Sequence, residues 1–336
     1  MIKFLVIGDF HYKKGMFTTS LHHLEKQLQR AHDEQVDFVI HTGDFSNDYT
    51  HSPEILRAYH QNSYGLPTYG VMGNHELEKE GNSMETVPPL LCHAPVTFGT
   101  SEDGPVGYWY GDIKNYRLIG LDTNHSYTPV EHKCMHNLAA SYGPPVENTG
   151  EDSLGATQIA WLEEKIADAA KQEKKVIVIS HASFMPPHNP SPDSDIVHAI
   201  FAKYPKTVLL AINGHNHTDN FDVFENVAYF DVNTTICGHW QLQKVVHYTS
   251  EHTFPFTDYD ENGLPIGTTD VSLADLRQGS NIWFFQDPLS AIVTITDDGE
   301  ITIQGSKTDW AFGIAPPITA EDTRPRISDH KVKLKI

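Results

Sequence analysis

The chain has 336 residues, of which 39% are hydrophobic and 20% are charged, which are the proportions of an ordinary folded protein. Lys and Arg number 24 against 44 Asp and Glu, so the formal net charge is −20, and a field of that sign repels nucleic-acid backbones and anionic membranes. We therefore expect one large domain or two modest ones, with neither long nucleic acid nor membrane as a partner.

The first predicted strand covers residues 4–8 and is an uninterrupted apolar run, as expected for a strand that is covered on both faces. It ends in Asp9-Phe10-His11, and residues two apart in an extended segment point the same way, so Asp9 and His11 can face one cation together. A helix over residues 21–34 follows, and a second apolar strand then leads through Gly43 to Asp44. This order predicts two parallel strands, whose C-terminal edge is where ligands bind in open α/β sheets.

The pattern of an apolar run, a small residue and a metal-type ligand recurs further along the chain. A strand over residues 66–72 runs into Gly73-Asn74-His75-Glu76, and a strand over residues 175–180 ends at His181. A strand over residues 207–212 then ends at Asn213-Gly214-His215-Asn216-His217. The other predicted elements are helices over residues 53–62, 157–172 and 194–204, a hairpin within residues 99–122, and antiparallel strands over residues 221–224 and 227–232.

The remaining regions differ from these elements in character. Residues 123–153 have little periodicity and contain three prolines, and a loop of this length is a lid, a substrate loop or a poorly ordered segment. Residues 250–280 are polar and rich in turn residues, whereas residues 292–303 predict a hairpin. Residues 315–336 are either a final strand or a mobile tail.

The sequence also bears on location. The chain opens directly in a predicted strand, without the regions of a secretory leader, and no run approaches the roughly 18 apolar residues of a transmembrane helix. The three cysteines, Cys92, Cys134 and Cys237, are too few and too scattered for a disulfide framework or a CxxC zinc site. We therefore expect a cytoplasmic protein.

The residues at the strand ends form one set of possible metal ligands. Taken singly, each is more often a satisfied polar residue, a turn residue or a helix cap than a ligand, and the ordered combination is what favours a metal site. Carboxylate and amide oxygens suit hard cations, while Mn, Fe and Zn also accept imidazole. The set is too large for one metal but suits two metals that share a carboxylate. It consists of Asp9, His11, Asp44, Asn74, His75, His181, His215 and His217.

In residues and in order, these motifs resemble those of the calcineurin-like metallophosphoesterase superfamily. The matching motifs are Asp9-Phe10-His11, Gly43-Asp44, Gly73-Asn74-His75-Glu76, His181 and Gly214-His215-Asn216-His217. The resemblance covers about residues 2–232 and implies an α/β (α+β) fold, a four-layer αββα sandwich of two mixed sheets flanked by helices. We accordingly predict a metallophosphoesterase domain over residues 1–235 and a β-rich C-terminal extension over residues 236–336, packed on the same domain.

The resemblance also implies a role for each site residue. Asp9, His11 and His217 would bind one metal ion, Asn74, His181 and His215 would bind the other, and Asp44 would bridge the two. A hydroxide bridging two Mn, Fe or Zn ions would attack phosphorus, while His75, unliganded, would stabilise or protonate the leaving oxygen. Glu76 stands where the family usually has Asp, and it is expected to orient the imidazole of His75 with an altered geometry.

The function that this resemblance implies is a metal-dependent phosphoric ester hydrolase acting on a phosphomonoester or phosphodiester, with a small molecule or nucleotide as substrate. The alternative is a non-catalytic, metal-binding scaffold or interaction protein on the same fold. A nuclease of the superfamily is a third hypothesis, but it needs a basic groove, and no Lys/Arg cluster lies near a motif. Residues near the motifs are expected to support the site or line its pocket, and these are His41, Asp48, Asp122, Asn124, His239 and Trp240.

Overall fold

The computed structural model describes most of the chain. The described residues are 1–12, 21–46, 52–77, 82–102, 104–124, 153–185, 191–235, 237–238, 253–259, 265–272, 283–311 and 324–336. Of these, residues 237–238, 253–259, 265–272 and 283–284 are described by their backbone alone. The predicted lid or substrate loop lies almost entirely outside these ranges, as do Asp48, His239 and Trp240.

The first sheet has six strands in the order β17-β16-β15-β1-β2-β3. Its strands are β1 (Ile2–Ile7), β2 (Phe38–His41), β3 (Thr68–Gly70), β15 (Ala291–Ile295), β16 (Glu300–Gln304) and β17 (His330–Lys333). Strands β1, β2 and β3 are parallel, as the strand–helix–strand order predicts, and β15 lies antiparallel to β1. Strands near both ends of the chain therefore form one sheet, and the domain boundary after residue 235 stays a prediction.

The second sheet has seven strands in the order β4-β5-β6-β7-β8-β10-β9. Its strands are β4 (Thr97–Phe98), β5 (Trp109–Ile113), β6 (Tyr116–Gly120), β7 (Lys175–Ser180), β8 (Val208–Asn213), β9 (Asn220–Phe224) and β10 (Val227–Asp231). Strands β6, β7, β8 and β10 are parallel, and β5 and β9 are antiparallel to their neighbours. Both sheets are therefore mixed, as predicted.

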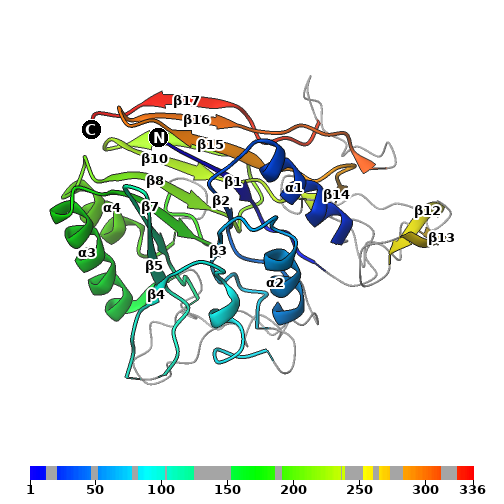
Figure 1. Ribbon diagram of the computed structural model, residues 1–336, viewed down its shortest axis with the longest axis horizontal. Helices are drawn as coiled ribbons and strands as arrows, with labels where there is room; N and C mark the ends of the chain where they lie inside the picture. The colour runs from blue at the N-terminus through cyan, green and yellow to red at the C-terminus, as the bar shows by residue number, and fades with distance from the viewer. Residues whose placement is uncertain are drawn as a thin grey trace.

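Three apolar clusters lie between the layers and pack them together. The largest lies between the sheets, and β1 contributes Phe4 and Val6 to it. The alternate β1 residues, Leu5 and Ile7, face the other way and pack with α1 (Leu21–Asp33) and α2 (Ser52–Gln61). On the far side, the second sheet packs against α3 (Gly155–Lys171) and α4 (Ser194–Ala202). Figure 1 shows the sheets between these two pairs of helices, which is the four-layer αββα arrangement expected from the sequence.

The region around residues 250–280 differs from its expected turn-rich character. It contains an antiparallel pair, β12 (Thr253–Tyr259) and β13 (Pro265–Ser272). The aromatic and β-branched residues of β12 favour a strand, but Pro255 within the run masks that preference. A further short pair joins β11 (Cys237–Gly238) to β14 (Trp283–Phe284), and a 3₁₀ helix covers Pro88–Leu90. Within the described ranges, no helix is both long enough and apolar enough to cross a membrane.

Candidate metal centre

The candidate ligands follow the C-terminal ends of five strands from both sheets. Asp9 and His11 follow β1, Asp44 follows β2, and Asn74 and His75 follow β3. In the second sheet, His181 follows β7, and His215 and His217 follow β8. Since the strands within each set are parallel, their C-terminal ends share one edge of the sandwich.

The turns that carry these residues need unusual backbone geometry. Gly43 has a φ of 93°, and a Cβ on Gly73 would lie 2.2 Å from the backbone nitrogen of Asp44. The turns after β2 and β3 therefore approach each other more closely than side chains on these glycines would allow.

Side-chain donor atoms from these turns form three groups, and in each group the atoms lie within 4.8 Å of one another. The first group is Asp9, His11 and His217, the second is His11, Asp44 and His75, and the third is Asp44, His181 and His215. His11 and Asp44 each belong to two of the groups. Asp44 Oδ2 lies 3.9 Å from His11 Nε2 and 3.2 Å from His181 Nε2, so this carboxylate lies between the two sets of donors.

Close contacts between ring nitrogens show how well these donors converge. His11 Nε2 lies 2.9 Å from His217 Nε2, and His215 Nδ1 lies 3.1 Å from His181 Nε2. The amide oxygen of Asn74 is 3.0 Å from the same His181 nitrogen. The structure thus brings together all seven residues predicted as ligands, and a set of imidazole, carboxylate and amide donors suits Mn, Fe or Zn.

His181 has the surroundings expected of a metal-binding histidine. Its Nδ1 lies 2.9 Å from the carbonyl oxygen of Thr42, and its Nε2 lies 3.2 Å from Asp44 Oδ2. A backbone carbonyl that accepts from one ring nitrogen fixes the ring and directs the other nitrogen at the metal. The geometry of His181 therefore fits a bound cation.

The ionisable side chains of the centre strongly shift one another's pKa values. Burial raises the pKa of Asp9 to about 7, with the charge of Asp44 adding to this effect and that of His181 opposing it. Burial alone would lower the pKa of His181, but the carboxylates of Asp44 and Asp9 raise it to about 10. The pKa of Asp44 lies well below its usual value, because neighbouring histidines outweigh the effect of burial. Two buried carboxylates need positive charge beside them, which cations would supply on binding.

His75 lies at the side of this centre. Its side chain is 24% exposed, against 1% for His181, and its Nε2 is 3.8 Å from Asp44 Oδ2. Its backbone N–H donates to Asp44 Oδ1 at 2.9 Å, so the His75 turn is fixed to the shared carboxylate. The position leaves the ring accessible to a bound substrate.

Glu76 has contacts that differ from those expected. Its carboxylate is fully buried and accepts hydrogen bonds from four backbone amides, those of Gly73, Asp44, Phe45 and Ser46, at 2.5 to 3.3 Å. These bonds join the turn after β3 to the turn after β2. The orientation of His75 by Glu76 stays a prediction that these contacts do not support, because both oxygens are directed at backbone amides.

Several supporting residues could not be identified from the sequence. Thr234 Oγ1 donates to the carbonyl oxygen of Asp9 at 2.9 Å, and Thr235 Oγ1 donates to that of Gly8 at 2.5 Å. These threonines lie more than two hundred residues from their partners, so no local motif signals the contacts. By contrast, the predicted supporting residue Asn124 donates through Nδ2 to the carbonyl oxygen of Met72 at 3.4 Å, beside the turn that follows β3.

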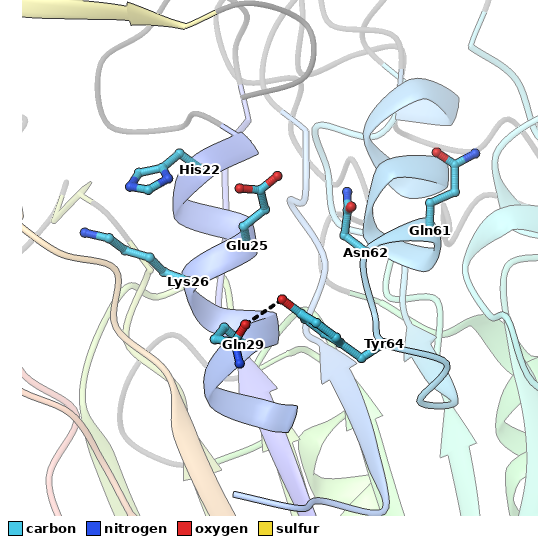
Figure 2. A pocket seen from close by; sticks show the side chains of 7 residues that line it. All are labelled: His22, Glu25, Lys26, Gln29, Gln61, Asn62 and Tyr64. Atoms are coloured by element: carbon cyan, nitrogen blue, oxygen red, sulfur yellow. Dashed lines mark hydrogen bonds between the residues drawn. The ribbon is translucent and has the colours of Figure 1, made fainter. Parts of the chain in front are cut away.

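A separate hollow of about 500 Å³ lies between α1 and the end of α2 (Figure 2). Within it the Tyr64 hydroxyl donates to Gln29 Oε1 at 2.6 Å. Its lining residues include none of the candidate ligands, so we assign it no chemistry. The lining residues are His22, Glu25, Lys26, Gln29, Gln61, Asn62 and Tyr64.

Comparison with known proteins identifies relatives of this chain. A family model described as calcineurin-like phosphoesterase matches residues 2–219. The sphingomyelinase phosphodiesterase C of Dictyostelium discoideum is 23% identical over 228 residues, which are 57% of this chain and 45% of that protein. The match thus spans less than half of that relative's length.

Solved structures with the same fold are more distant in sequence. A dimetal phosphatase from Danio rerio is 14% identical, with a TM-score of 0.59 over 99% of both chains. GAP50, the anchor in the inner membrane complex of Plasmodium, is 12% identical, with a TM-score of 0.50 over 100% of this chain and 89% of that chain. At these identities the likeness shows the fold alone.

Proposed function

The chain belongs to the calcineurin-like phosphoesterase family, and from this premise we propose that it hydrolyses phosphoric esters with the help of two bound metal ions. The observation that carries the proposal is the convergence of seven Asp, Asn and His side chains at the strand ends. Their convergence supports a shared chemical task, because packing alone does not require so many buried polar donors at one point.

The proposed ligand sets are the ones that the family resemblance implies. Asp9, His11 and His217 would hold one ion, and Asn74, His181 and His215 would hold the other. Asp44 would contact both, which is supported by its Oδ2, since this atom lies 3.9 Å from His11 Nε2 and 3.2 Å from His181 Nε2. When bound, Mn, Fe or Zn ions supply positive charge that attracts phosphoryl oxygens and lowers the pKa of water.

His75 is the residue that we propose to act on the leaving group. Its partly exposed imidazole lies beside Asp44, so it can reach a substrate held at the centre. A histidine in this position can donate a proton to the departing oxygen, which is the part of the reaction most sensitive to a general acid. The side chain of Glu76 would contribute indirectly, by fixing the turn that presents His75.

We further propose a small phosphomonoester or phosphodiester as the substrate, including nucleotides. The net charge of −20 disfavours long nucleic acid and so argues against a nuclease. The Dictyostelium relative, which is 23% identical, is a sphingomyelinase phosphodiesterase, and this supports a diester. The cytoplasmic location and the absence of a membrane partner stay predictions.

A non-catalytic scaffold is the alternative. GAP50, described as an anchor, shares the fold, and a fold does not by itself specify a function. The full set of converging donors is the feature that favours hydrolysis in this chain.

Elemental analysis of the purified protein, followed by assays after reconstitution with Mn, Fe or Zn, tests the proposal. We expect about two metal equivalents and turnover of p-nitrophenyl phosphate or bis-p-nitrophenyl phosphate. An Asp44→Asn protein purified in the same way controls for contaminating phosphatases and should be inactive.

Each other outcome of this experiment has a definite meaning. A protein that binds none of these metals would overturn the proposal. Bound metal without hydrolysis of monoesters, diesters or nucleotides would favour the scaffold. Cleavage of single-stranded DNA in preference to both small esters would favour a nuclease.

A further inference from the structure

The turn that carries His215 and His217 contacts the C-terminal segment, residues 324–336. The carboxylate of Asp219, two residues after His217, accepts the backbone N–H of Ser328 at 3.0 and 3.1 Å through its two oxygens. The Ser328 hydroxyl also donates to Asp219 Oδ2 at 2.5 Å. Three hydrogen-bond contacts thus join residues that are 109 positions apart.

This turn has a conformation that needs support from outside. His215 and His217 have φ values of 66° and 50°, in the left-handed region that costs a non-glycine residue about 1 kcal/mol or more. At the start of the turn, the His215 N–H donates to both carboxylate oxygens of Asp9, at 3.0 and 3.1 Å. At its end, the Asp219–Ser328 contact provides the corresponding restraint. The turn is therefore held at both ends.

The C-terminal segment is itself well fixed beside the centre. Ile327 is buried, and its N–H donates to the Ser306 carbonyl at 2.8 Å. The carbonyl of Arg326 accepts from Asn233 Nδ2 at 3.0 Å, just after strand β10. Beyond Ser328 the segment continues into β17, which pairs with β16. Ser328 therefore offers Asp219 a partner that lies two residues before a strand of the first sheet.

We propose that Asp219 and Ser328 are positioning residues, through which the C-terminal segment holds His217 in the geometry that binds metal. This inference rests on the proposed function, because it presumes that His217 is a metal ligand. The family match ends at residue 219, so Ser328 lies outside the part of the chain that the family model covers. The inference extends the functional centre to a segment for which the family match predicts no role.

The test compares Asp219→Asn, Ser328→Ala and the double variant with the wild type. Asp222→Asn is the matched control, because Asp222 is an exposed aspartate three positions further along, in β9. Titration calorimetry of the metal-free proteins with Mn²⁺ alone gives the affinity, and thermal unfolding without metal shows whether each variant folds. Steady-state hydrolysis at increasing Mn²⁺ then separates lost affinity from lost catalysis.

We expect Asp219→Asn to weaken Mn²⁺ binding about tenfold. This is the lower end of the loss that follows removal of a hydrogen-bond partner of a metal ligand, because Asp219 acts on His217 through the backbone. Excess Mn²⁺ should restore most of kcat, since the ligands themselves are intact. Ser328→Ala should have a smaller effect, because the backbone N–H of residue 328 still reaches Asp219. The double variant should bind Mn²⁺ with the same affinity as Asp219→Asn, because both substitutions act on one contact. Asp222→Asn should bind Mn²⁺ like the wild type.

Wild-type Mn²⁺ affinity in a folded Asp219→Asn protein would overturn the inference, even if its melting temperature were lower. If Asp219→Asn does not fold, Ser328→Ala decides the question, and wild-type affinity in that variant would overturn the inference. Failure of the wild type to bind Mn²⁺, Fe²⁺ or Zn²⁺ would instead refute the proposed function, so the two failures are distinguishable.

Discussion

At the scale of single residues, strained backbone conformations are frequent at the candidate metal centre. Ten non-glycine residues in the described ranges have positive φ, and four of them are His11, Asp44, His215 and His217. Such conformations persist only where surrounding contacts impose them, and they often occur at functional sites. The same residues converge on one another, so the strain supports a chemical task at these positions.

His75 is the residue whose role is most open to direct test. His75→Ala should lower kcat by roughly 10²–10⁴-fold, the usual contribution of a general acid, because the leaving oxygen would lose its proton donor. Metal content should remain that of the wild type. Elemental analysis and steady-state assays on the same preparation measure both quantities.

His32→Ala is the control, since His32 is exposed on α1, away from the strand ends, and should leave both quantities unchanged. His75 also belongs to a donor group with His11 and Asp44. If His75→Ala lost metal, His75 would be a ligand and its assignment as the acid would be wrong.

At the scale of elements, the turns after β2 and β3 act as one unit because of Glu76. Its carboxylate is buried and accepts four backbone amides from these turns. Burial raises its pKa, the Asp44 charge adds to that effect, and hydrogen bonds from the amides oppose it. Charge-assisted hydrogen bonds of this kind are stronger than neutral ones, so we expect them to contribute strongly to holding the two turns together.

Glu76→Gln should therefore lower the free energy of unfolding of the metal-free protein by about 2 to 4 kcal/mol, because an amide group cannot accept all four hydrogen bonds and leaves buried N–H groups unpaired. Urea unfolding followed by circular dichroism measures this loss. Glu85→Gln, an exposed glutamate after the same turn, should unfold like the wild type. Equal stability of the two variants would show that the amide contacts contribute little.

Local patterns predicted most elements and nearly all of the candidate site. The strand over residues 175–180 appears as β7 with the predicted bounds, because an apolar run flanked by polar residues is a local signal. Contacts between distant segments had no such signal. The direction of the Glu76 carboxylate and the Asp219–Ser328 contact depend on how separate turns meet, which residue spacing does not encode. The β12–β13 pair was missed because Pro255 interrupts its pattern.

At the scale of the whole molecule, the first sheet joins the start of the chain to its last strands. β1 lies between β2 and β15 (Figure 1). The register of β1 and β15 places Ile2 opposite Ile295 and Phe4 opposite Val293. The strand that carries Asp9 is thereby a central strand, protected on both edges. The C-terminal strands thus contribute to the stability of the centre as well as to its geometry.

Buried histidines that are not candidate ligands give the whole molecule a predictable response to acid. Burial lowers the pKa of His23 to about 4 and that of His41 to about 3. In an unfolded chain, a histidine takes up a proton near pH 6.5. Between these values the unfolded state binds more protons than the folded state, so the free energy of unfolding falls as the pH falls.

His23 allows this effect to be measured in isolation, because it lies on α1 and not among the candidate ligands. From its two pKa values, His23 should account for about 2 kcal/mol of the stability lost between about pH 8 and about pH 5. His23→Gln has no titrating group at position 23. Its free energy of unfolding should therefore fall by about 2 kcal/mol less than that of the wild type over this pH range. Urea unfolding of the chelator-treated proteins at both pH values measures the difference. An unchanged pH dependence in His23→Gln would mean that His23 accepts a proton without unfolding, and that its burial does not oppose charging.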